Sequence, residues 1–145
     1  MEQRPSIREI AVSDAESVAR LSAELGYAVS AAAMAERILR LEGTPHRAVF
    51  VACMSDSVVA WIDVGEVCHL QSEPAGEIGG FVVAEGFRST GIGRELICRA
   101  EQWARDRGLE RMVVRCQIKR DAAHRFYLRE GYELAKTSHI FVKPL

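Results

Sequence analysis

The chain has 145 residues, a length typical of one domain, with 48% apolar and 27% charged residues. Its formal net charge of −1 supplies no broad attraction to nucleic acid or to an anionic membrane. The first ten residues lack the apolar core of a signal peptide, and no apolar run approaches the ~20 residues that span a bilayer. We therefore expect one cytoplasmic domain over residues 1–145, with no nucleic-acid partner and no membrane partner.

The cysteines and histidines do not have the spacing of metal ligands. No two cysteines form a CxxC motif, and they are spread too evenly for a zinc ribbon. The histidines are isolated from one another. Of the four cysteines, Cys53, Cys98 and Cys116 lie in apolar stretches and Cys68 does not, which favours buried thiols in a reducing compartment. The spacing of the cysteines and of the histidines predicts no metal; the histidines are His46, His69, His124 and His139.

The chain opens with the pattern of a strand followed by a helix. Residues 6–12 favour a strand. Ser13 and Glu16 have the spacing of a capping box, which predicts that a helix begins there, and Gly26 is its expected end.

A second helix and a hairpin follow. Ser30 precedes the helix, whose apolar stripe contains Met34, Ile38 and Leu41 and which ends at Gly43. Two apolar runs separated by a short polar turn predict a β-hairpin, and a run containing Ser, Pro and Gly predicts a loop. These ranges are 48–54 and 58–64 for the strands and 69–76 for the loop.

The second half alternates strands and helices. Gly79 and Gly80 interrupt a strand, which often marks a bulge or a close approach of ligand or backbone. The full set of elements is an α/β or α+β domain around one mixed sheet. The ranges are strand 78–83, helix 91–107, strand 111–116, helix 121–130, and strands 132–135 and 139–142.

Between strand 78–83 and helix 91–107 lies a glycine-containing turn, Arg88-Ser89-Thr90-Gly91-Ile92-Gly93-Arg94. A helix N-terminus offers unpaired N–H groups and partial positive charge, so a phosphate fits there. The turn lacks the Gly-Lys-Ser/Thr of a P-loop and the third glycine of a dinucleotide-binding loop. A plain strand-to-helix turn is the alternative.

This segment, together with Ala123-His124-Arg125-Phe126-Tyr127-Leu128-Arg129-Glu130-Gly131-Tyr132, resembles the acetyl-CoA motifs of the GNAT superfamily of N-acetyltransferases. The order and spacing of elements match over nearly all of the chain. The resemblance implies a single GNAT-like domain with a mixed, mostly antiparallel sheet of about seven strands, splayed at its centre and flanked by about four helices. It also leaves a homodimer through residues 139–142 open.

The resemblance further implies acetyl-CoA as co-substrate and the residues that bind it. The turn would hold the pyrophosphate and the strand before it would pair with the pantetheine arm. Arg120 stands where the family usually has Asn, and Gln117 is a nearby substitute. The implied cofactor-binding residues are Phe81, Val82, Val83, Arg88, Ser89, Thr90, Gly91, Ile92, Gly93, Arg94, Arg120, Ala123, Phe126 and Tyr127.

Acetyl transfer to an amine needs a base for the amine and benefits from a proton for the departing thiolate. The resemblance implies Glu77 as general base and Tyr127 as general acid; a solvated glutamate and a packing tyrosine are the alternatives. Asp63 and Glu66 lie on or just after a strand that could reach the same cleft, or form an exposed polar edge. His69 and His139 are alternative bases.

The predicted function is therefore transfer of the acetyl group from acetyl-CoA to a primary amine of a small molecule, by direct attack in a ternary complex. Four alternatives stay open: acetylation of a protein N-terminus or lysine, a non-catalytic CoA-binding regulatory domain, a nucleotide-binding module, and a structural or interaction domain, which would leave the glycine turn unexplained. The identity of the acceptor is not readable from the sequence.

Overall fold

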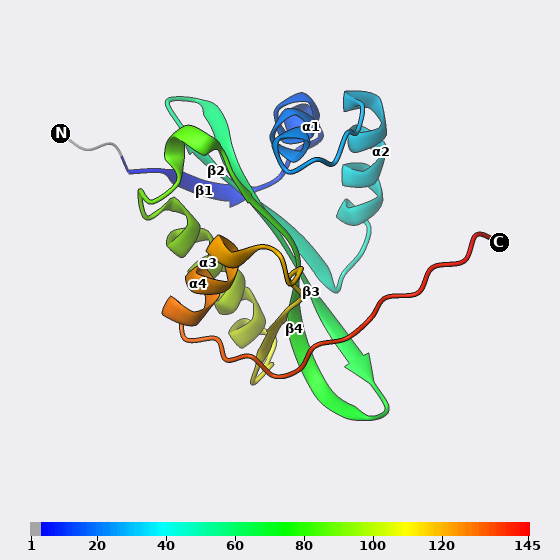
Figure 1. The fold of residues 1–145 in the computed structure, drawn as a ribbon. Helices are drawn as coiled ribbons and strands as arrows, with labels where there is room; N and C mark the ends of the chain where they lie inside the picture. The colour runs from blue at the N-terminus through cyan, green and yellow to red at the C-terminus, as the bar shows by residue number, and fades with distance from the viewer. Residues whose placement is uncertain (1–3) are drawn as a thin grey trace. The chain divides into compact units, whose positions relative to one another are not determined.

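The structure is a computed structural model that describes residues 4–145, and the chain divides into two compact units, Met1–Arg115 and Cys116–Leu145. The first unit contains a five-stranded sheet (Figure 1). Its strands are β1 (Ser6–Glu9), β2 (Arg47–Met54), β3 (Ser57–His69), β4 (Ser72–Val83) and β5 (Met112–Val114). Its helices are α1 (Ala15–Glu24), α2 (Ala31–Glu42) and α3 (Ile92–Asp106), with 3-10 turns η1 (Val12–Asp14) and η2 (Glu85–Phe87).

The strands lie in the sheet in chain order, from β1 to β5. Neighbours from β1 to β4 are antiparallel, whereas β4 and β5 are parallel because α3 returns the chain between them. The mixed, mostly antiparallel sheet is thus confirmed. The expectation of about seven strands is wrong by two.

The β3–β4 hairpin is longer than the sequence predicts. Residues 69–76 were expected as a loop, yet pairing runs out to His69 opposite Ser72. Ser72, Pro74 and Gly76 suggested a loop, but the extended strands need only two residues to turn. The preceding β2–β3 turn is formed by Ser55 and Asp56, both with positive φ.

Alternation along the strands divides the sheet into two apolar faces. Phe50 and Ile62 are paired and fully buried, and Arg99 of α3 stacks 4.6 Å from the centre of the Phe50 ring, so this face is covered by α3. Val51 and Trp61 are also paired but point the other way, into a cluster with α1 and α2. In Figure 1, α1 and α2 lie on one side of the sheet and α3 on the other.

Helix α1 begins differently from the prediction. Instead of a Ser13–Glu16 capping box, the Asp14 carboxylate accepts a hydrogen bond from the Ala11 N–H at 2.8 Å, and the helix starts at Ala15 after a 3-10 turn. Arg8 on β1 donates to both oxygens of Asp14, at 2.7 and 2.8 Å. This ion pair ties the first strand to the first helix.

The Arg8–Asp14 pair predicts a specific loss of stability in acid. The hydrogen bonds from Arg8 lower the pKa of the buried Asp14 carboxyl, so its contribution is full above about pH 4 and is lost as pH falls through the lowered folded-state value. Asp14→Asn should reduce the free energy of unfolding near pH 7 by about 1.5–3 kcal/mol. Urea titration measures this, with exposed Asp56→Asn as control. Equal stability of the two variants contradicts the assignment.

The second unit contains α4 (Asp121–Arg129). Gly131, two residues after the last residue of α4, has φ of +93°, as expected where the sequence predicts the helix to stop. The expected strands 132–135 and 139–142 are not formed. Ile140, Phe141 and Val142 are 80%, 93% and 87% exposed. An apolar run becomes a strand only where a neighbouring backbone pairs with it, and no strand of the sheet does so here.

Candidate functional site

Strand β4 carries a bulge at the position that its glycines predict. Asp63 of β3 pairs with Gly80 and Val64 pairs with Ile78, so Gly79 is an extra residue on β4. A Cβ on Gly79 would lie 2.6 Å from an Asp63 oxygen, and one on Gly80 would lie 2.7 Å from the Trp61 ring. Both glycines therefore let large β3 side chains lie flat across β4.

Beyond Ile78, β4 continues without β5, which ends at Val114. Pairing with β5 spans Gly76 to Ile78, while β4 continues to Val83 and η2. The sequence prediction that the Phe81–Val83 segment splays from its neighbour agrees with this register. Backbone groups on that edge of β4 are thus positioned to pair with an extended ligand instead of a strand.

The turn after η2 forms an open N-terminus for α3. Gly91 is the N-cap, with φ of +90°, and nothing lies within 4 Å of a Cβ built on it. The first hydrogen bond of the helix runs from Glu95 N–H to Gly91 C=O at 3.1 Å, so the N–H groups before it have no acceptor within the helix. Thr90 donates to the Phe87 carbonyl and Arg88 to the Val83 carbonyl, which hold the turn together.

This arrangement fits a pyrophosphate. A helix N-terminus without a Cβ in the way presents donors and partial positive charge to an anion. Arg88 is exposed beside it and adds a full positive charge. The residues predicted to bind the phosphates, from Arg88 to Arg94, are contiguous around this N-terminus.

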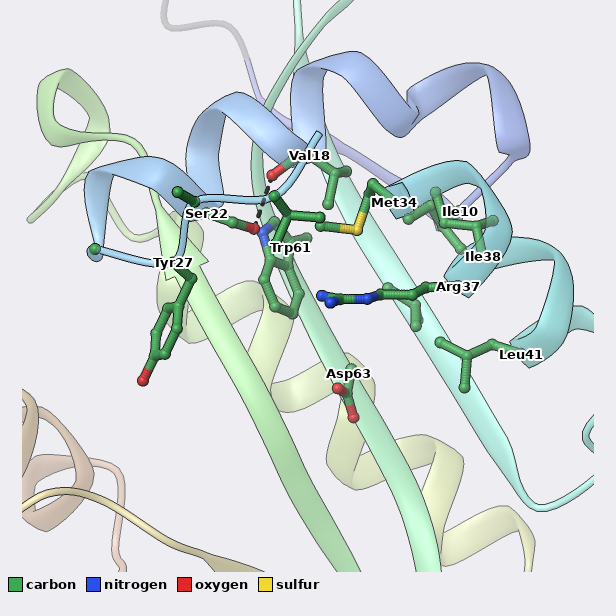
Figure 2. Close-up of a pocket in the computed structure, with 14 residues that line it drawn as sticks. Ile10, Val18, Ser22, Tyr27, Met34, Arg37, Ile38, Leu41, Trp61 and Asp63 are labelled. Atoms are coloured by element: carbon green, nitrogen blue, oxygen red, sulfur yellow. Dashed lines mark hydrogen bonds between the residues drawn. The ribbon is translucent and has the colours of Figure 1, made fainter. Parts of the chain in front are cut away.

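A pocket of about 520 Å³ lies on the sheet face covered by α1 and α2 (Figure 2). Its volume is within the range of small-molecule sites. Trp61 and Asp63 of β3 form part of its wall, and they pair with Val82 and Gly80 of β4. The pocket therefore adjoins the splayed strand. Its lining is Ile10, Val18, Ser22, Gly26, Tyr27, Ala28, Val29, Met34, Arg37, Ile38, Leu41, Val49, Trp61 and Asp63.

Two polar features mark the β3 side of this pocket. Asp63 forms an ion pair with Arg47, and a Cβ on Gly65 would lie 2.7 Å from the Arg47 guanidinium, so glycine provides the space for that side chain. Burial raises the pKa of the Asp63 carboxyl, although Arg47 opposes the shift. The Trp61 indole N–H is buried and has no hydrogen-bond partner among residues 4–145.

Glu77 lies on β4, two residues before Gly79, the extra residue of the bulge. Its oxygen is 3.3 Å from the Arg115 Nε, and its side chain is 21% exposed. Gly76 faces α3, since a Cβ there would touch Ala104, so Glu77 faces the opposite side, where Arg47 and Asp63 lie. Glu77 is therefore on the pocket face of the sheet, although it is not one of the residues that line the pocket.

The remaining predicted residues belong to the second unit. Burial, together with the charge of Cys116, raises the pKa of the Tyr127 phenol to about 12, which keeps it protonated at neutral pH. Its ring makes edge contacts with Phe126 and Tyr132, with centroids 5.5 and 5.9 Å apart. Arg120 is the N-cap of α4, and Ala123 lies in its first turn.

Among residues 4–145 there is no group of three or more His, Cys, Asp or Glu side chains arranged to hold a metal ion. Within the same residues, every helix is too short or too polar to cross a bilayer.

A bulged strand that splays from its parallel neighbour and leads into an anion-binding helix N-terminus is the arrangement that the sequence motifs predict. The Acetyltransferase (GNAT) family matches residues 7–132 of the chain. The chain belongs to the GNAT acetyltransferase family. The predicted family is confirmed.

Two curated relatives are N-acetyltransferases by name. The aminoalkylphosphonate N-acetyltransferase of Salmonella typhimurium is 41% identical over 97 residues, which are 66% of this chain and 61% of that protein. The matched part of the chain thus spans less than two thirds of that relative. The aminoglycoside N(6')-acetyltransferase type 1 of Stenotrophomonas maltophilia is 26% identical over 146 residues, covering 97% of this chain and 94% of that protein.

Solved structures confirm the GNAT fold. An aminoglycoside 6'-acetyltransferase in complex with a bisubstrate analog, CoA-S-monomethyl-acetylneamine, superposes with a TM-score of 0.85 at 18% identity, covering 99% of this chain and 100% of the other. At this identity the likeness shows the fold alone.

The structure bears on Asp63, for which the sequence left two interpretations open. Asp63 was open between an exposed polar edge and a cleft residue, and it lines the pocket with a side chain that is 23% exposed. The signal was present in the sequence: Trp61 and Asp63 alternate with apolar residues on a strand whose partner carries two adjacent glycines.

Proposed function

We propose that this GNAT protein transfers the acetyl group of acetyl-CoA to the primary amine of a small molecule, by direct attack in a ternary complex. Acetyl-CoA supplies an activated thioester carbonyl. The observation that carries the proposal is the continuity of one strand: β4 borders the pocket through its pairing with β3, leaves β5 after Ile78, and leads through η2 to the open N-terminus of α3.

Each predicted residue has a task in this scheme. The N-terminus of α3 and Arg88 bind the pyrophosphate, and the backbone of Phe81–Val83 orients the pantetheine arm. The pocket holds the acceptor amine, and Glu77 receives its proton directly or through water. Tyr127 donates toward the departing thiolate. Arg120, Ala123 and Phe126 complete the cofactor-binding set.

The cofactor site is tested by replacing Gly91. Acetyl-CoA at about 100 times its dissociation constant should stabilise the parent by ~2.7 kcal/mol. Gly91→Asp should abolish this effect, because its carboxylate would lie against the phosphate. The positive φ at Gly91 adds strain of about 1–2 kcal/mol to any side chain. Thermal unfolding with and without acetyl-CoA measures both effects.

Two controls separate charge from strain. Gly108 has φ of +76° and nothing within 4 Å of a Cβ, but it lies after the other end of α3, so Gly108→Asp should keep the full stabilisation by acetyl-CoA. Gly91→Asn has nearly the shape of Gly91→Asp without its charge and should retain part of it. A folded Gly91→Asp protein with unchanged stabilisation would remove the cofactor assignment.

Acetylation itself is tested with a panel of acceptors and a thiol-release assay. Turnover of a small amine supports the proposal. Turnover of peptides alone would favour a protein N-terminus or lysine as acceptor. Stabilisation by acetyl-CoA without turnover of any acceptor would indicate a regulatory CoA-binding domain, and stabilisation by ATP instead would indicate a nucleotide-binding module. The cytoplasmic location and the homodimer stay predictions.

A further inference from the structure

The pocket contains one charged residue from each of its two walls. Of the fourteen residues that line it, Arg37 of α2 and Asp63 of β3 are charged. Most of the others are apolar, so each charge stands out against a hydrophobic surface. Figure 2 shows the Arg37 side chain reaching from α2 toward Trp61 and Asp63.

Arg37 is exposed and lines the pocket from α2. Met34, Ile38 and Leu41 also line the pocket, and with Arg37 they have the 3–4 residue spacing of one helix face. Arg37 therefore flanks the buried stripe of α2, on its exposed side. Among residues 4–145 the Arg37 guanidinium makes no ion pair. An exposed guanidinium that lines the pocket and makes no ion pair has its donors available for an anionic ligand.

The opposite charge lies next to the reacting strand. Asp63 pairs in register with Gly80 of β4, at the bulge. The Arg47 guanidinium donates a hydrogen bond to one oxygen of the Asp63 carboxylate. The same carboxylate borders the pocket. An ammonium or amine placed against Asp63 is thus beside the strand that the proposed function assigns to the thioester.

We propose that the acceptor is a small primary amine that also carries an anionic group, with its amine against Asp63 and its anion against Arg37. This inference rests on the proposed function and names its substrate class. Guanidinium binds phosphonate and carboxylate alike, in a bidentate manner. A polycationic acceptor is disfavoured, because several ammonium groups would share an apolar pocket with Arg37.

The test compares four amines of similar size as acceptors: 2-aminoethylphosphonate, β-alanine, uncharged propylamine and a diamine. We expect kcat/KM to be at least about 10-fold higher for an anionic amine than for propylamine. The two anionic probes distinguish phosphonate from carboxylate. Arg37→Gln should lower kcat/KM for the preferred anionic amine about 10- to 100-fold, through KM, and lower that for propylamine much less, so that the ratio of the two values falls toward one.

Two further variants test whether the charge of Arg37 sets the acceptor preference. Arg37→Glu should lower kcat/KM for the anionic amine further and raise it for the diamine, an exchange of preference that a purely structural role for Arg37 would not produce. Arg40, three residues after Arg37 on the same helix, is also exposed and does not line the pocket, so Arg40→Gln is the matched control and should behave as the parent.

The outcomes separate the two proposals. Equal kcat/KM for propylamine and the anionic amines, or equal loss for all amines in Arg37→Gln, overturns the inference and leaves the proposed function standing. Stabilisation by acetyl-CoA without acetylation of either anionic amine also overturns the inference. Absence of both stabilisation and acetylation overturns the proposed function itself.

Discussion

Replacing Tyr127 with Phe is expected to lower turnover roughly 10²–10⁴-fold if its hydroxyl assists the departing thiolate. The substitution keeps the ring and its edge contacts with Phe126 and Tyr132. Burial raises the pKa of Tyr127 to about 12, so the phenol holds its proton throughout the usual assay range and does not produce a falling limb there. The thermal shift with acetyl-CoA should change little.

Tyr132→Phe is the matched control, since it removes a hydroxyl from the ring that packs against Tyr127. Its turnover should stay within about twofold of the parent. Steady-state and single-turnover rates of thiol release measure both variants. If Tyr127→Phe also keeps the parent rate, Tyr127 has a packing role, and the thiolate departs without a proton from this residue.

Secondary structure was predictable wherever a local signal fixed it. Ser30 caps α2 through a 3.1 Å hydrogen bond from the Ala33 N–H, and Gly43 ends that helix. Gly91 and Gly131 take positive φ at the boundaries of helices, as expected of glycine. These features depend on residues within one turn of one another, so the sequence alone contains the information.

The failures involve partners that lie outside the segment whose pattern was used for the prediction. The run His139–Val142 has strand composition but no strand partner in the sheet, and Ser72–Gly76 is a strand because β3 extends alongside it. Asp14, rather than Ser13, closes the first helical turn because Arg8 on β1 holds its carboxylate. Tertiary contacts decided each case over local propensity.

The candidate site also has one part that the local sequence predicts and one part that it does not. The anion-binding turn could be predicted because its donors are consecutive residues around Gly91. The pocket could not, because its lining comes from α1, α2, β2 and β3 and from the loop between the helices. Arg37 is unremarkable in sequence and becomes informative only when its helix face is known.

Asp63 and Glu77 lie on the same sheet face and have different proposed roles, which their variants should distinguish. Burial raises the pKa of Asp63 and the charge of Glu77 adds to the shift, so the two groups are coupled. Glu77→Gln should lower kcat by roughly 10²–10⁴-fold, because it removes the proposed base. Turnover rises with pH as the base loses its proton, so this variant should move the rising limb to higher pH.

Asp63→Asn should act mainly on KM, for anionic and neutral amines alike, because Asp63 is proposed to hold the amine. Glu73→Gln, an exposed glutamate on the same strand, is the control for Glu77→Gln and should keep the parent profile. Full pH profiles of kcat and kcat/KM separate the two roles, with acetyl-CoA stabilisation verifying that each variant is folded. If Asp63→Asn shifts the rising limb and Glu77→Gln does not, the base is Asp63. In that case Glu77 serves to pair with Arg115, and the amine is deprotonated within the pocket itself.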